Sequence, residues 1–149
     1  MGAKDIRFPP VQALGKDVAD ALKAGVYSAK SDAFVVGTST QPGLLFNVPK
    51  NVRINDIIVH TTTAVTGATP DTLVVGTAGD SDMFHSSSDT VNLGTHSMKY
   101  GSALNAGGKE CSTGSIQVTA DWSTGSTAGG FWFEILYSPF GAENFVNNP

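Results

Sequence analysis

The densest group of side chains that could bind a metal lies in one short stretch. Asp80, Asp82, His85 and Asp89 supply carboxylates and an imidazole, which are common ligands of Ca²⁺ and Zn²⁺. Their spacing does not match an EF-hand loop, which needs acidic residues at several fixed positions and a closing Glu. Short Asp side chains also bond to nearby backbone amides in turns, and this interpretation is favoured. Asp80 and Asp82 are the only metal-site candidates, and no cofactor is predicted.

Motifs for covalent catalysis or phosphate binding are not found. No G-x-S-x-G motif occurs, so His60 and His96 are predicted to be structural or surface residues. No pair of acidic residues can be assigned to glycoside hydrolysis. Gly107-Gly108-Lys109 lacks the Ser or Thr that would follow the lysine of a phosphate loop. Cys111 has only Lys109 as a nearby cation, which favours a buried or inert thiol. We therefore predict that the protein is not an enzyme.

Four aromatic residues suggest a second possible function. Trp122, Trp132, Tyr100 and Tyr137 could form a platform on which a sugar ring stacks. Aromatic residues in strands more often fill the core, and that interpretation is favoured here. A carbohydrate-binding or receptor-binding module is the alternative hypothesis, and it requires these rings to be exposed in a groove.

Length and composition indicate one domain that is stable without disulfide bonds. A chain of 149 residues buries roughly 70% of its unfolded surface. The net charge is -4 and no basic stripe is visible, which argues against nucleic-acid binding. No apolar run is long enough to cross a membrane, and the N-terminus has no apolar signal region. A single cysteine cannot form an intrachain disulfide, so a product made in a reducing cytoplasm is expected.

Alternating apolar residues predict many short strands. The stretch from Phe46 to Thr77 reads as two strands joined by a turn of Thr, Gly, Ala and Pro. The alternating apolar residues are at even positions before Asn55-Asp56 and at odd positions after it, which predicts a β-bulge there. Upstream, Leu44, Phe46 and Val48 are expected to share one face. Gly76 to Asp82 and Ser86 to Asp89 are expected to be loops.

The last two strands have the clearest pattern. Residues 116–122 alternate strictly between apolar and polar side chains. Residues 131–137 are apolar on both faces, so this strand is predicted to be central, or covered on its outer face by a partner. The fold class is therefore all-β, an antiparallel β-sandwich or jelly-roll-like fold.

The two ends of the chain are less regular. Val11, Leu14, Val18 and Leu22 follow helical spacing, and an extended arm reaching a neighbour is the rival interpretation. We expect an arm or short helix at 1–30, a sandwich domain at 31–140 and a tail at 141–149. The interface candidates are apolar residues of these parts and of the last strand: Phe8, Val11, Leu14, Val18, Leu22, Trp132, Leu136 and Phe145.

The segment from Leu44 onward resembles small virion structural proteins of tailed bacteriophages. It contains F-x-V-P-x-x-x-x-I-x-D-I-x-V-x-T-T-T, a turn, and T-L-x-V-G-x-x-G-D-x-D-x-F. The closing GFWFEILY also resembles their last strand, and the similarity spans about residues 31–140. The resemblance implies a capsid decoration (cement) protein, or a related fibre or neck component. It further implies a homotrimer bound to the major capsid protein on the virion surface.

Overall fold

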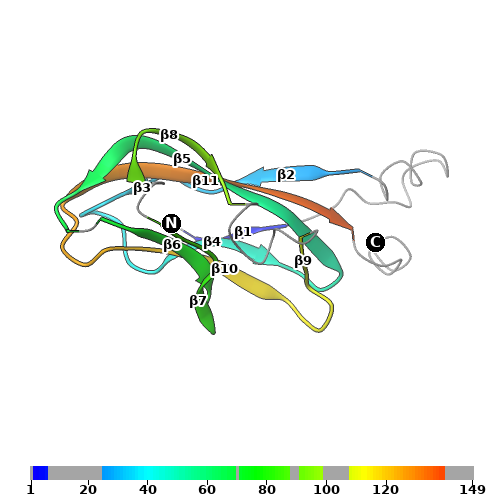
Figure 1. The fold of residues 1–149 in the computed structure, drawn as a ribbon. Helices are drawn as coiled ribbons and strands as arrows, with labels where there is room; N and C mark the ends of the chain where they lie inside the picture. Colours follow the sequence, from blue (N-terminus) through cyan, green and yellow to red (C-terminus); the bar gives the residue numbers. More distant parts are fainter. Residues whose placement is uncertain (1, 7–24, 70, 88–90, 99–107, 140–149) are drawn as a thin grey trace.

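The computed structural model describes residues 2–6, 25–69, 71–87, 91–98 and 108–139 of the chain. Two β-sheets lie face to face and enclose the core between them (Figure 1). The fold is thus an all-β, jelly-roll-like sandwich, as the alternation of apolar residues predicted. No described segment forms a helix with the length and apolar character needed to span a membrane.

One sheet, called the β10 sheet below, has the order β1-β4-β10-β6-β7. Its strands are β1 (Lys4–Asp5), β4 (Gly43–Val48), β10 (Ile116–Trp122), β6 (Leu73–Thr77) and β7 (Asp80–Ser87). The other, called the β11 sheet, has the order β2-β11-β5-β8, with β3 also pairing β11 and β9 also pairing β5. Its strands are β2 (Tyr27–Lys30), β11 (Ala128–Pro139), β5 (Val52–Thr66), β8 (Gly94–Ser97), β3 (Phe34–Val35) and β9 (Lys109–Glu110).

The predicted bulge in β5 is confirmed. Leu136 of β11 lies opposite Asp56 and Tyr137 lies opposite Ile54, so Asn55 is the extra residue. The extra residue shifts the alternation by one, so even-numbered residues before it and odd-numbered residues after it face the same core. Ile54 and Ile57 are both fully buried as a result.

The prediction that β11 is central is also confirmed, because it lies between β2 and β5. Its inward residues build an aromatic cluster with β3. Phe133 is fully buried, and its ring centroid lies 5.6 Å from Phe131 and 6.3 Å from Phe34, edge-on in both cases. Edge-to-face contacts of this kind add roughly 0.5–1.5 kcal/mol to the burial of each ring.

The expected face of Leu44 is wrong. Val118 of β10 lies opposite Phe46, but the next residue, Thr119, lies opposite Leu44. Leu45 is therefore an extra residue, and it is fully buried while Leu44 is 39% exposed. Three consecutive apolar residues have no alternation, so the pattern could not reveal which one faces the core.

The loop expected at Gly76–Asp82 is also wrong, as is the loop that was expected to begin at Ser86. β6 and β7 form a hairpin, and β7 runs from Asp80 to Ser87. Asp and Ser are uncommon in strands, but among the described strands β7 pairs with β6 alone, and its backbone hydrogen bonds to β6 hold it in place.

The N-terminal 30 residues contribute two short strands. β1 pairs in parallel with β4, and β2 pairs antiparallel with β11. Both sheets therefore include residues from the segment expected to be an arm. The helix predicted at 11–24 and the tail lie outside the described residues, and the domain boundaries at 30 and 140 stay predictions.

Candidate interaction surface

The outer face of the β11 sheet carries a row of large side chains. Trp132 lies opposite His60, and Glu134 lies opposite both Ile58 and Lys30. Leu136 follows on the same side of β11. These residues, Lys30, Ile58, His60, Trp132, Glu134 and Leu136, are called the Trp132 face below. All of them are half-buried except Lys30, which is exposed, so large apolar groups here keep part of their surface in water.

Trp132 is held between the two neighbouring strands. The His60 ring of β5 stacks on it with centroids 3.7 Å apart and planes 7° from parallel. From β2, the Lys30 ammonium lies 5.2 Å from the centre of the Trp132 ring. A cation over an indole ring contributes roughly 0.5–1 kcal/mol at an exposed site. The indole is therefore fixed in one orientation before any partner approaches.

His60 connects this stack to two polar groups. Its Nδ1 lies 3.1 Å from the Thr95 hydroxyl of β8, and its Nε2 lies 3.5 Å from Glu134 Oε2. The second distance is long for a hydrogen bond. The side chains of four adjacent strands, β2, β11, β5 and β8, thus contact one another in a continuous row across the sheet.

The outer face of the β10 sheet has a different character. Asn47 donates to Asp5 Oδ1 over 2.9 Å, and Gln117 donates to Asn47 Oδ1 over 3.1 Å. This forms a polar ladder across β1, β4 and β10. Partial burial raises the pKa of Asp121 on β10. A face already rich in paired polar groups gains little from burial against another protein.

Exposed apolar residues are also concentrated on the β11 sheet. Val35 lies in β3 and is 51% exposed. Val26 and Leu93 immediately precede the edge strands β2 and β8, and both are exposed. Only Leu44, of the four exposed large apolar residues described, belongs to the β10 sheet. Val26 and Leu93 adjoin opposite edges of this sheet, so these residues are separate exposures, whereas the Trp132 face forms a continuous row across it.

The structure brings together two of the interface candidates found in the sequence. Trp132 and Leu136 lie on the same face of β11. The other six candidates, Phe8, Val11, Leu14, Val18, Leu22 and Phe145, lie outside the described residues. Sequence analysis missed Lys30, His60 and Glu134, because only the register between strands far apart in the chain makes them neighbours of Trp132.

The metal-site candidates occupy the start of β7. Asp80 and Asp82 are exposed there, and His85 is half-buried. Asp89 lies outside the described residues. In the described part of the chain, no three His, Cys, Asp or Glu side chains are placed so that they could share a metal ion.

The proposed sugar platform is not formed by the described aromatic residues. Trp122 is only 6% exposed and packs against Phe34 and Phe131. Tyr137 is buried and stacks on Tyr27. Trp132 is flanked by His60 and Lys30. The core interpretation is thus confirmed for Trp122 and Tyr137, and Tyr100 lies outside the described residues.

Cys111 is buried, and burial raises the pKa of its thiol to about 11. The thiol, rather than the reactive thiolate, is then the form present at neutral pH. We expect less than about a tenth of Cys111 to react with Ellman's reagent at pH 8 within the time in which a guanidinium-unfolded sample reacts completely. Rapid labelling of the folded protein would contradict this burial.

Comparison with known proteins finds similarity in fold only. The sequence matches no protein family and no curated protein. A chain of the cyanophage Pam1 capsid asymmetric unit is similar in structure, with a TM-score of 0.52 and 18% identity over 75% of this chain and 83% of that chain. A chain of the acidic stable capsid structure of Helicobacter pylori bacteriophage KHP30 has a TM-score of 0.51 and 14% identity over 75% and 86%.

Proposed function

We propose that this chain is a non-enzymatic structural protein of a bacteriophage virion. Its most specific role would be a capsid decoration, or cement, protein that binds the major capsid protein on the head surface as a homotrimer. The observation that carries the proposal is the shared fold with chains of two phage capsids. Both matches cover 75% of this chain and 83% and 86% of the compared chains, so the likeness extends over most of each chain.

The Trp132 face supports the proposal because it offers a surface suited to permanent contacts. Its apolar groups lie on a rigid sheet, and Trp132 is already oriented by His60 and Lys30. Fixing side chains before association lowers the entropy that binding costs. Each contact needs only modest affinity, because the linked subunits of an oligomer bind through several contacts at once.

A charge placed on the Trp132 face should weaken assembly. We expect Leu136→Lys to reduce binding to undecorated phage heads at least tenfold, because the new ammonium group would lose its hydration when this face is covered. Binding is measured by co-sedimentation of the purified chain with heads, and the oligomer mass by light scattering.

Leu44→Lys is the matched control. Leu44 is also a partly exposed leucine on the outer side of a sheet, but it belongs to the β10 sheet. It should leave head binding within about twofold of the unchanged protein. If the unchanged protein does not bind heads, the decoration function is wrong. If the two variants bind equally, the Trp132 face is not the contact surface.

A further inference from the structure

The N-terminal strand β1 occupies a site formed by both sheets. Its backbone pairs with the edge strand β4, where Lys4 lies opposite Phe46 and Asp5 opposite Asn47. The Ile6 amide continues the ladder by donating to the Asn47 carbonyl over 3.0 Å. The Ile6 side chain is only 3% exposed and belongs to the core. A three-residue segment therefore completes the core at one edge.

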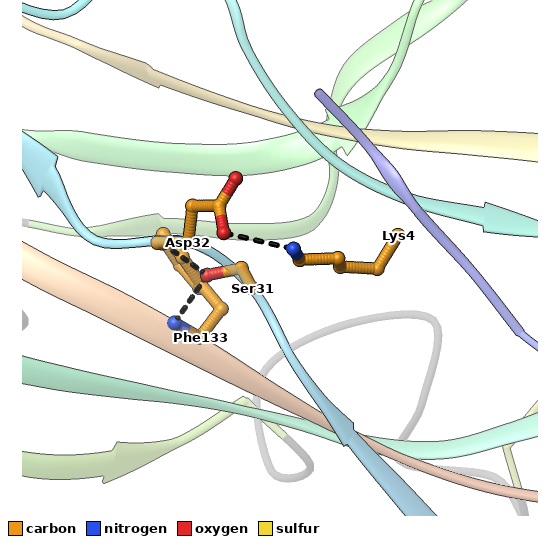
Figure 2. Close-up of polar contacts among 4 residues, drawn as sticks. All are labelled: Lys4, Ser31, Asp32 and Phe133. Carbon is orange, nitrogen blue, oxygen red and sulfur yellow. Dashed lines mark hydrogen bonds and ion pairs between the residues drawn. The ribbon is translucent and has the colours of Figure 1, made fainter. Parts of the chain in front are cut away.

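A second contact ties β1 to the opposite sheet. Lys4 Nζ lies 2.9 Å from Asp32 Oδ1, in the link between β2 and β3 (Figure 2). This hydrogen bond lowers the pKa of Asp32. Ser31 anchors this link to β11. Its backbone amide donates to the Phe133 carbonyl, and its hydroxyl accepts from the Phe133 amide, each over 2.9 Å. The site that receives β1, called the acceptor site below, thus consists of the β4 edge and Asp32.

The connection that follows β1 is longer than this site requires. Residues 7–24 join Ile6 to Gly25, and a chain of that length reaches up to about 60 Å. Gly25 lies seven residues before Asp32, so it is at most about 25 Å from the Lys4–Asp32 pair. The connection can therefore carry β1 to an acceptor site on an adjacent copy.

β1–β4 is also the only parallel pairing among the described strands. A hairpin cannot make a parallel pair, so the short turns that fix β6 against β7 do not fix β1 against β4. The pairing of β1 with β4 would have the same register whether β1 comes from the same chain or from a neighbouring copy.

We propose that β1 is exchanged between copies, so that Lys4–Ile6 of one subunit fill the β4 edge and pair with Asp32 of the next. The inference rests on the homo-oligomer of the proposed function and adds which segment links its subunits. Every contact of β1 is kept in the exchange, so the swap costs little, and the local concentration of copies within an oligomer favours it.

Paired cysteines test the exchange. Chains carrying D5C and chains carrying N47C, with different affinity tags, are produced together and oxidised. Opposite residues of paired strands are close enough for a disulfide. We expect a covalent product containing both tags, and covalent dimers or larger species from the double variant D5C/N47C. Buried Cys111 should stay reduced.

A matched pair on β10 provides the control. Gln117 also lies opposite Asn47, but on a strand deep in the same sheet. N47C/Q117C should give only monomers with an internal disulfide, and mixed N47C and Q117C chains should give no product with both tags.

The exchange is overturned if D5C/N47C gives only internally bonded monomers, or if the mixed D5C and N47C chains give no covalent product. Light scattering and head binding are measured on the unchanged chain. An internal disulfide in a chain that still forms oligomers and binds heads therefore refutes the exchange alone.

Discussion

A chain lacking Asn55 should still accumulate as folded protein. Without the extra residue β5 alternates regularly, so Val52 and Ile54 stay on the same face as Ile57 and remain in the core, where all three are fully buried. Arg53 keeps its outward position and its pair with Glu110. The deletion removes the hydrogen bond from Asn55 Nδ2 to the Ser138 hydroxyl, so the free energy of unfolding should fall by only about 0.5–1.5 kcal/mol.

The deletion is tested by the soluble yield and far-ultraviolet circular dichroism of the variant. Asn55→Ala is the control, since it keeps the length of β5 and removes only the hydrogen bond from Asn55 Nδ2 to the Ser138 hydroxyl. That change should cost about 0.5–1.5 kcal/mol. A deletion variant that fails to fold while Asn55→Ala folds would show that the bulge itself is needed for the packing of β5.

Replacing Phe133 by Ala should lower the free energy of unfolding by about 3–5 kcal/mol. The ring is fully buried on the central strand and makes edge contacts with Phe34 and Phe131. It lies in the core between the two sheets, on a strand flanked by β2 and β5, so the cavity left behind cannot collapse easily. Urea unfolding followed by circular dichroism, at one protein concentration, measures the change.

Val35→Ala is the comparison for this substitution. Val35 lies in β3, on the same side of the sandwich, but about half of it is exposed. Its replacement should change the free energy of unfolding by no more than about 0.5 kcal/mol. Equal losses for the two variants would mean that Phe133 is not part of a closely packed core.

Sequence reasoning succeeded where apolar residues alternate. The change of parity at Asn55-Asp56 identified a bulge, because the buried residues on both sides of it are β-branched and unambiguous. The apolar residues on both faces of residues 131–137 identified the central strand. It failed at Leu44-Leu45-Phe46, because three consecutive apolar residues do not show which of them faces the core. It also failed in β7, because the residues of this edge strand are mostly polar.

The candidate site was only half predictable. Trp132 and Leu136 stand out because they are large apolar residues on the second face of a strand. The contribution of His60 depends on its pairing with Trp132, 72 positions later, and on the position of Lys30 on a third strand. Such pairings arise from packing of the whole sandwich, which local patterns do not encode.

The exposed acids of β7 have a consequence for edge-to-edge association of two copies. β7 is the last of the described strands of the β10 sheet, and no described strand pairs with its outer edge. Asp80 and Asp82 are exposed on this strand, and two copies placed edge to edge would bring their carboxylates together. Mutual repulsion would oppose the extension of one sheet into the next. The two residues that the sequence offered as metal ligands therefore disfavour the growth of ribbons and fibrils through β7.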